Sequence, residues 1–302
     1  MPPRVIRVTE VGDKARRLID GASVATVVAA LSRSLYLDVG GEIVWLGPPG
    51  SILHTRAIVV HDPPNLDAGA RIETSFDLRE ARQWRPHTLD SRLDPTILAR
   101  ASRRLVEGVD RLGRPDGFGA LLVGRRPAFP LDHAADRARR FLESCARGDA
   151  ASAATIGERL LGLGPGLTPA GDDLVGGAFF ARRFTVRGFT GWGAPTAPPI
   201  PPRRAFVDDW KNAAVVIRAR ARERTHPISA TLLGDLLDGC GHAPLHDLAL
   251  ALARDDAAGA LDAAARLVRI GHSSGWDMLT GVLGALCELP ATTDGGKPES
   301  MA

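Results

Sequence analysis

Hydrophobic and polar positions in residues 1–92 follow one another in short runs, a pattern typical of β-strands. Residues 35–39 and 42–46 are two such runs, and they flank the pair Gly40-Gly41. Two glycines between strands favour a tight hairpin, because its turn needs positive φ angles. Residues 57–60 form another strand candidate, whereas residues 24–31 fit a strand or a helix. A small β-rich barrel or sandwich is therefore expected for residues 1–92.

From residue 93 onward the apolar positions recur at helical spacing. Asp94 followed by Pro95 predicts the start of a helix, and Gly113 predicts its end near residue 112. The same periodicity predicts further helices over residues 133–146, 150–161, 169–183, 206–222, 228–237, 245–253, 257–270 and 276–289. The sequence thus predicts an α+β protein, in which a β-rich domain precedes an α-helical domain over residues 93–290.

Two segments lack this periodicity. Residues 188–204 are rich in proline, which predicts an exposed loop within the helical domain. Residues 291–302 follow the last predicted helix and are expected to form a disordered tail. We found no internal repeat that would suggest a solenoid or a duplicated domain.

Composition places the chain among ordinary globular proteins, with 44% hydrophobic and 24% charged residues in 302. No run approaches the roughly 20 apolar residues of a membrane span, and the N-terminus lacks the apolar core of a signal peptide. A cytoplasmic protein without membrane contact is expected. The net charge is +3, and the many arginines are interleaved with acidic residues and few aromatics. Nucleic-acid binding is therefore not expected.

The three cysteines, Cys145, Cys240 and Cys287, lie far apart and form no Cys-x-x-Cys pair. They indicate reduced thiols rather than a disulfide framework or a zinc site. The histidines also lack the spacing of zinc ligands on a common element.

The segment with the strongest chemical signal is residues 162–173, which read GLGPGLTPAGDD and lead into a predicted helix. Gly164 and Gly166 permit backbone conformations closed to other residues and let a ligand approach the main chain. Thr168 suits an N-cap, and Pro169 suits the first helical position. Free backbone amides and the positive end of the helix dipole favour an anion such as phosphate.

Asp172 and Asp173 fall within or just after the first turn of this helix. Adjacent helical positions differ by about 100° around the axis, so one carboxylate can face the loop and the other a neighbouring helix. A carboxylate beside a phosphate site indicates a bridging cation such as Mg²⁺, or a proton acceptor. Gly171, Gly176 and Gly177 weaken the helix, and close backbone packing is their simplest explanation. In the alternative interpretation the aspartates only complement the helix dipole.

Two further predicted helix starts carry polar residues. In residues 225–229, Thr225, His226 or Ser229 suits a helix cap, and His226 could also act as an acid, a base or an anion donor. In residues 271–277, Ser274 and Asp277 fit a capping box. The capping box does not explain His272 and Ser273 before it, or Gly275 in the first turn of the helix.

The run of residues 162–173 resembles the signature of a bacterial family linked to a subunit of oxamate carbamoyltransferase, an enzyme of anaerobic allantoin catabolism. Residues 271–275 look like the second signature of that family, and residues 225–229 like a weaker third. The family motif usually carries serine where this chain has Ala170. The resemblance implies a part in interconverting oxalurate plus phosphate with oxamate plus carbamoyl phosphate, in a complex with other subunits.

The resemblance also implies roles for individual residues, because carbamoyl transfer needs a phosphate cradle, donors for an oxyanion and a proton carrier. The residues expected to contact the small anionic substrate or its phosphate are Gly164, Gly166, Thr168, Gly171, Ser229, Ser273 and Ser274. Those expected to carry protons are Asp172, Asp173, His226 and His272. Because they adjoin the expected phosphate site, the two aspartates are also the candidate ligands for a magnesium ion.

Three other functions fit the same residues. The glycine-rich turns would form a docking surface in a non-catalytic partner subunit. The adjacent aspartates would hold magnesium with a nucleotide in an enzyme of another class. A regulatory sensor would bind the small molecule without turnover.

Overall fold

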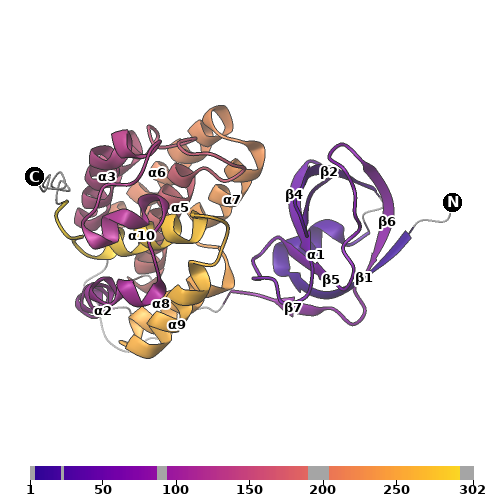
Figure 1. The fold of residues 1–302 in the computed structure, drawn as a ribbon, viewed down its shortest axis with the longest axis horizontal. Coiled ribbons are helices and arrows are strands. Elements are labelled where there is room, and N and C mark those ends of the chain that lie inside the picture. The colour runs from indigo at the N-terminus through magenta and orange to yellow at the C-terminus, as the bar shows by residue number, and fades with distance from the viewer. Residues whose placement is uncertain (1–3, 22–23, 87–93, 190–203, 293–302) are drawn as a thin grey trace, which may run out of the picture. The chain divides into compact units, whose positions relative to one another are not determined.

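The computed structural model describes residues 4–21, 24–86, 94–189 and 204–292 (Figure 1). Its contacts divide the chain into two units. The first unit comprises residues 1–87 with residues 240–243, and the second comprises residues 88–239 and 244–302. No helix within the described ranges is both long and apolar enough to cross a membrane.

The first unit is built on a mixed β-sheet with one short helix. Its elements are β1 (Arg4–Gly12), α1 (Asp13–Ile19), β2 (Val24–Ala30), β3 (Leu35–Val39), β4 (Glu42–Gly47), β5 (Ala57–Val60), β6 (Arg71–Asp77) and β7 (Arg82–Trp84). The strands lie in the order β5-β4-β3-β2-β6-β1-β7, and β5 also pairs with β1. The strands therefore form one mixed sheet rather than two packed sheets.

The predicted hairpin is confirmed: β3 and β4 pair antiparallel around Gly40 and Gly41, whose φ angles are +63° and +87°. The ambiguous run at residues 24–31 is a strand, β2. Along β3 the residues Leu35, Leu37 and Val39 are buried and those between them are half-buried. This alternation places one face of the hairpin in the core, because side chains of a strand point to opposite faces in turn.

The second unit is helical. Its elements are α2 (Pro95–Glu107), η1 (Val109–Leu112), η2 (Gly117–Val123), η3 (Asp132–Ala134), α3 (Ala135–Arg147), α4 (Ala150–Gly157), α5 (Ala170–Phe189), α6 (Arg204–Arg224), α7 (Pro227–Leu237), α8 (Ala243–Ala253), α9 (Ala257–Leu267) and α10 (Ser274–Leu286). The predicted α+β class is confirmed.

Several helix boundaries differ from the prediction. Asp94 caps α2 as expected, but α2 ends at Glu107 and a 3₁₀ turn completes the predicted segment. The helix predicted over residues 150–161 ends at Gly157. Helix α5 begins at Ala170, one residue later than expected, and extends to Phe189. Most of the predicted proline-rich loop and of the predicted tail lies outside the described residues, which omit 190–203 and 293–302.

Helices α5 and α10 lie side by side with their backbones in contact (Figure 1). A Cβ atom added to Gly177 would overlap the carbonyl oxygen of Met278, and one added to Gly281 would overlap that of Leu174. The close packing predicted for Gly177 is therefore confirmed. The Thr168 hydroxyl, just before α5, lies near Ser274 at the start of α10. Further along both helices, Gly177 of α5 lies beside Met278 of α10. The two helices thus run in the same direction and begin at the same end.

Candidate functional site

The carboxylate of Asp172 joins two of the three predicted turns. One oxygen, Oδ1, accepts a hydrogen bond from the backbone N–H of Gly162 at 2.8 Å. The other, Oδ2, accepts from Ser229 Oγ at 2.5 Å and from the hydroxyl of Thr225. Ser229 lies in the first turn of α7, 57 residues away from Asp172 in the chain. The starts of α5 and α7 are therefore held together by one buried carboxylate.

The turn at residues 271–277 joins the same cluster through hydroxyl groups. Thr168 Oγ1 lies 3.0 Å from Ser274 Oγ, across 106 residues of sequence. Ser274 is the first residue of α10, so the starts of α5, α7 and α10 lie close together. Each helix N-terminus carries a partial positive charge and N–H groups without intrahelical partners. Their convergence favours a small anion at this point.

A second pair of carboxyl groups lies where α5 and α10 meet. Asp173 is 8% exposed and Asp277 is fully buried. Burial raises the pKa of Asp277 to about 8, although hydrogen bonds from the Phe118 amide and from Ser273 act in the opposite direction. Burial, followed by the nearby charge of Asp277, raises the pKa of Asp173 well above its usual value. Asp277 is therefore largely neutral at pH 7, and burial also favours the neutral form of Asp173.

The capping box predicted for Ser274 and Asp277 is wrong. Ser273 occupies the N-cap position of α10, and Ser274 is already helical. Asp277 Oδ1 instead accepts a hydrogen bond from the backbone N–H of Phe118 in η2, at 2.7 Å. This partner lies 159 residues away, so the local pattern gave no sign of it. Asp277 is thus a residue of the candidate site that the sequence reasoning assigned to helix capping alone.

Asp172 differs from Asp173 and Asp277, because both of its carboxylate oxygens accept hydrogen bonds. Burial raises its pKa, and the hydrogen bonds from Ser229, Thr225 and Gly162 oppose that shift. A carboxylate bonded by a backbone N–H and two hydroxyls is best satisfied in its ionised form. Asp172 therefore holds the turns in place rather than facing a ligand.

The glycine-rich loop itself has one packed glycine and one open glycine. Gly164 has φ +109°, and an added Cβ would lie 2.9 Å from the backbone nitrogen of Ala170. Gly166 has φ +95°, is exposed and has no atom within 4 Å of an added Cβ among the described residues. Gly164 thus fixes the loop against the start of α5, whereas Gly166 leaves room for a ligand beside the main chain.

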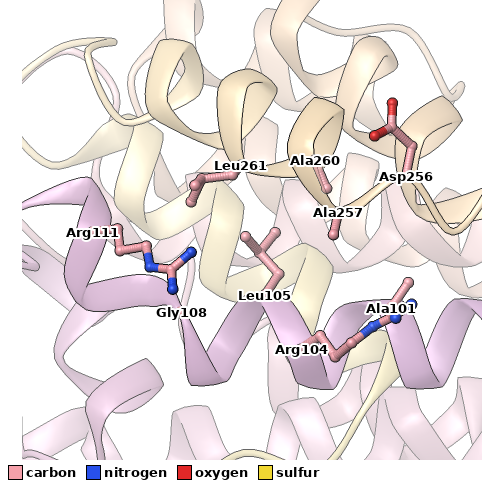
Figure 2. Close-up of a pocket in the computed structure, with 9 residues that line it drawn as sticks. All are labelled: Ala101, Arg104, Leu105, Gly108, Arg111, Asp256, Ala257, Ala260 and Leu261. Atoms are coloured by element: carbon pink, nitrogen blue, oxygen red, sulfur yellow. The ribbon is translucent and has the colours of Figure 1, made fainter.

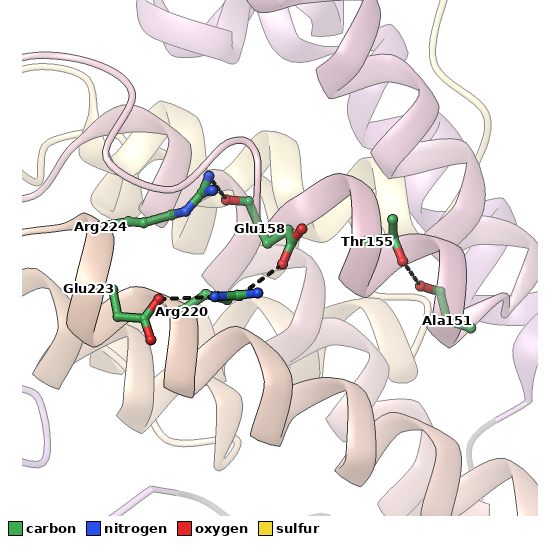
Figure 3. Close-up of polar contacts among 6 residues, drawn as sticks. All are labelled: Ala151, Thr155, Glu158, Arg220, Glu223 and Arg224. Carbon is green, nitrogen blue, oxygen red and sulfur yellow. Dashed lines mark hydrogen bonds and ion pairs between the residues drawn. The ribbon is translucent and has the colours of Figure 1, made fainter.

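Arginines at the end of α6 hold the chain where this loop begins (Figure 3). Arg220 Nε donates to a carboxylate oxygen of Glu158 at 3.2 Å, and Arg224 donates to the backbone oxygen of Glu158 at 3.1 Å. Gly162 has φ +75°, and an added Cβ would overlap the carbonyl oxygen of Arg224. The loop therefore starts from a rigid corner between α4 and α6.

Two residues predicted to contact the substrate make structural contacts. The N–H of Gly171 donates to the carbonyl oxygen of Leu163 at 2.9 Å, and an added Cβ would overlap the carbonyl oxygen of Leu160. Gly171 is therefore a packing glycine, and its amide is already bonded. Ser229 is buried and its hydroxyl donates to Asp172. Gly275 is a packing glycine too, because an added Cβ would overlap the backbone at the end of α9.

The two histidines lie on the periphery of the cluster. His272 is 97% exposed, and its Nε2 atom lies 3.1 Å from Asp116 Oδ2. His226 is half-buried and caps α7, because its Nδ1 atom accepts a hydrogen bond from the Ile228 N–H at 3.2 Å. The role of His226 as a helix cap is confirmed, and this leaves Nε2 as its only other ring nitrogen for proton transfer.

The predicted magnesium site receives no support from the donor geometry. Asp172 directs its carboxylate to Thr225 and Ser229, whereas Asp173 interacts with Asp277. The two adjacent aspartates therefore belong to different contacts. Within the part of the chain that the structure describes, no group of three or more His, Cys, Asp or Glu side chains is arranged to hold a metal ion.

A surface pocket lies elsewhere in the helical unit, between α2 and α9 (Figure 2). Its floor is apolar, with Leu105 and Leu261, and its rim carries Arg104 and Arg111. The lining includes no residue of the three turns. The pocket is thus distinct from the cluster at the helix starts.

Comparison with known families identifies a partial match in the helical unit. Residues 200–286 match the family model described as "Oxamate carbamoyltransferase subunit AllH". This match confirms the predicted link to that family and covers the turns at residues 225–229 and 271–277. The glycine-rich run at residues 162–173 lies outside the matched stretch. Comparisons with curated proteins and with solved structures gave no match.

Proposed function

We propose that this chain is a subunit of an oxamate carbamoyltransferase-like enzyme and binds a small phosphate- or carbamoyl-bearing anion. The observation that carries the proposal is the meeting of three helix starts, joined by the Asp172 hydrogen bonds and by the contact between Thr168 and Ser274. The family match over residues 200–286 supports the class of enzyme. The reaction would interconvert oxalurate plus phosphate with oxamate plus carbamoyl phosphate.

The chemistry of the cluster supports a binding site for such an anion. Gly166 offers exposed main chain next to the start of α5, and the half-buried hydroxyls of Thr168 and Ser273 lie at the starts of two helices. Hydroxyl and amide donors at fixed positions stabilise a developing oxyanion without reorganising during the reaction. Burial raises the pKa of Asp277 to about 8, so this carboxyl adds little negative charge at pH 7 to the start of α10, where the helix dipole favours an anion.

The complete enzyme would contain further subunits and act in the cytoplasm. The family description names a subunit, which supports an assembly of different chains. In such an assembly this chain holds the anion, and other subunits would complete the environment in which the carbamoyl group is transferred.

Ligand-dependent thermal unfolding of the full-length chain tests the proposal. The ligands are carbamoyl phosphate, phosphate, oxamate and ATP, each with and without Mg²⁺. A ligand at one hundred times its dissociation constant stabilises the folded state by about 2.7 kcal/mol, so a clear rise in Tm is expected with carbamoyl phosphate. The absence of a shift with every ligand would contradict the proposed anion site on this chain.

A matched pair of threonine variants locates the effect. Thr168→Ala removes the hydroxyl that contacts Ser274, whereas Thr155→Ala removes a hydroxyl that donates to the backbone of its own helix, at Ala151 (Figure 3). We expect Thr168→Ala to weaken the shift with carbamoyl phosphate and Thr155→Ala to preserve it. Equal shifts in both variants would place the anion elsewhere on the chain.

A further inference from the structure

We propose that Asp173 and Asp277 form the proton-holding pair of the candidate site, and that these carboxyl groups exchange a proton with the bound anion when it reacts. The inference rests on the proposed function, because it names the groups that move the proton at that same site. It assigns a role to Asp277, which the sequence pattern had attributed to helix capping. It also replaces the two histidines as proton carriers.

The pair contains buried oxygens that nothing else satisfies. Asp173 Oδ2 and Asp277 Oδ2 are buried and have no hydrogen-bond partner among the residues that the structure describes. Buried polar atoms are almost always hydrogen-bonded, and an unpaired one destabilises the fold. A proton on the carboxyl or a donor from a ligand would satisfy each atom. In either case the pair can hold a proton or accept a hydrogen bond from a ligand.

The two carboxyl groups lie close enough to influence each other. Helices α5 and α10 run in the same direction from a common end, and Asp173 and Asp277 lie in the first turns of these helices. The charge on Asp277 raises the pKa of Asp173. Neighbouring buried carboxyls titrate as a pair, since ionisation of one opposes ionisation of the other. The pair therefore favours states that retain a proton, and burial raises the pKa of Asp277 to about 8.

The groups around the pair shift the pKa values of the two carboxyls in both directions. Asp116 precedes η2, and its charge raises the pKa of Asp277 further. Asp172, on the same helix as Asp173, raises the pKa of Asp173. Hydrogen bonds from Ser274 to Asp173, and from Phe118 and Ser273 to Asp277, act in the opposite direction. His272 faces Asp116 rather than the pair.

The other candidate proton carriers are less suitable. His272 is almost fully exposed, so solvent would exchange its proton freely. His226 already uses Nδ1 to cap α7. Asp172 accepts hydrogen bonds from three donors and is best satisfied as an ionised carboxylate. Only the Asp173–Asp277 pair combines burial, a retained proton and unbonded oxygens within the described part of the cluster.

The proton movement balances for attack of hydrogen phosphate on the carbamoyl group of oxalurate. A phosphate oxygen bonds to the carbamoyl carbon, the bond from that carbon to the oxamate nitrogen breaks, and the electron pair passes to nitrogen. The nitrogen takes a proton from the pair, and the pair regains a proton from the phosphate hydroxyl. The products are carbamoyl phosphate and oxamate, and no oxidant, reductant or additional acid is consumed.

Isothermal titration calorimetry with carbamoyl phosphate tests the inference on the full-length chain at pH 8. The titration is repeated in two buffers that differ in ionisation enthalpy, so the difference in heat reports protons taken up or released. Anion binding beside a half-ionised Asp277 would raise its pKa, and we expect uptake of a fraction of a proton. Asp277→Asn and Asp173→Asn should bind with little or no proton uptake, whereas the exposed Asp110→Asn should behave as the unchanged chain.

The outcomes separate the two proposals. Binding heat that is the same in both buffers for the unchanged chain would overturn the proton-holding pair and leave the proposed function standing. Equal proton uptake in the unchanged chain and in Asp277→Asn would also overturn it. No binding heat with carbamoyl phosphate would overturn the proposed function and the inference with it.

Infrared spectroscopy gives a readout that does not depend on the variants folding. The unchanged chain in D₂O should show a protonated-carboxyl band at pH 6 to 7, a range in which exposed carboxyls are ionised. Part of that band should disappear as the pH is raised through about 8. A spectrum without such a band would overturn the inference.

Discussion

Removing the Asp172 carboxylate should destabilise the protein, because this group accepts hydrogen bonds from three segments. In Asp172→Ala the Gly162 N–H and the hydroxyls of Thr225 and Ser229 all lose their acceptor. A buried donor left unpaired costs about 1–3 kcal/mol. Ser229 is buried and bears this cost, whereas Gly162 and Thr225 are half-buried and can partly turn to water. We therefore expect a loss of about 3–5 kcal/mol in the free energy of unfolding.

Asp172→Asn should lose less, about 1–2 kcal/mol, since the amide oxygen can still accept from Gly162 while the amide N–H groups donate to the hydroxyls. Urea unfolding followed by circular dichroism measures both values. The exposed Asp110→Ala, expected within about 0.5 kcal/mol of the unchanged chain, is the control. An Asp172→Ala variant as stable as this control would refute the reasoning.

Three further predictions follow from burial and packing. The pKa of Asp277 is about 8 in the folded chain, above its ordinary value of 3.8. The unfolded chain therefore binds fewer protons than the folded chain between pH 4 and pH 8. The free energy of unfolding should fall as the pH rises through this range, by up to about 1.4 kcal/mol per pH unit. Urea unfolding at several pH values should show this slope, which flattens in Asp277→Asn; an unchanged slope in that variant would argue against it. Gly177→Ala should lower the free energy of unfolding by about 3 kcal/mol or more, because the added methyl group overlaps α10. Gly166→Ala should lower it by only about 1–2 kcal/mol, through backbone strain. Comparable losses in the two variants would contradict the assigned packing. Burial raises the thiol pKa of Cys145 and of Cys287 to about 12, so both should resist alkylation at pH 8 until the chain unfolds, and rapid labelling of the folded chain would refute this.

Local signals in the sequence predicted much of the fold. The Gly40-Gly41 turn defined its hairpin, and Asp94 capped its helix, because a hairpin turn and a helix cap depend on a few neighbouring residues. Strand β1 was not predicted, and its partners are β5, β6 and β7. Such pairings join segments that lie far apart in the sequence, so no local pattern identifies them.

The candidate site was predictable as segments but not as an arrangement. The three turns could be picked out because glycines, hydroxyls and acids gather at helix starts. Their convergence depends on side chains such as Asp172, whose partners lie at Thr225 and Ser229. Asp277 fitted a local capping pattern and was assigned to it, although its partner, Phe118, comes from η2. Burial decides the chemistry of such a carboxyl, and burial follows from the tertiary packing.

Hydrogen exchange with and without carbamoyl phosphate tests the central claim, that three helix starts form one anion site. The backbone amides of residues 162–173, 225–229 and 271–277 should exchange more slowly when the ligand is bound, and all three segments should become protected over the same ligand concentrations. Peptides from the exposed face of α6 should be unaffected. Protection of only one segment, or of none while the ligand binds, would contradict a shared site.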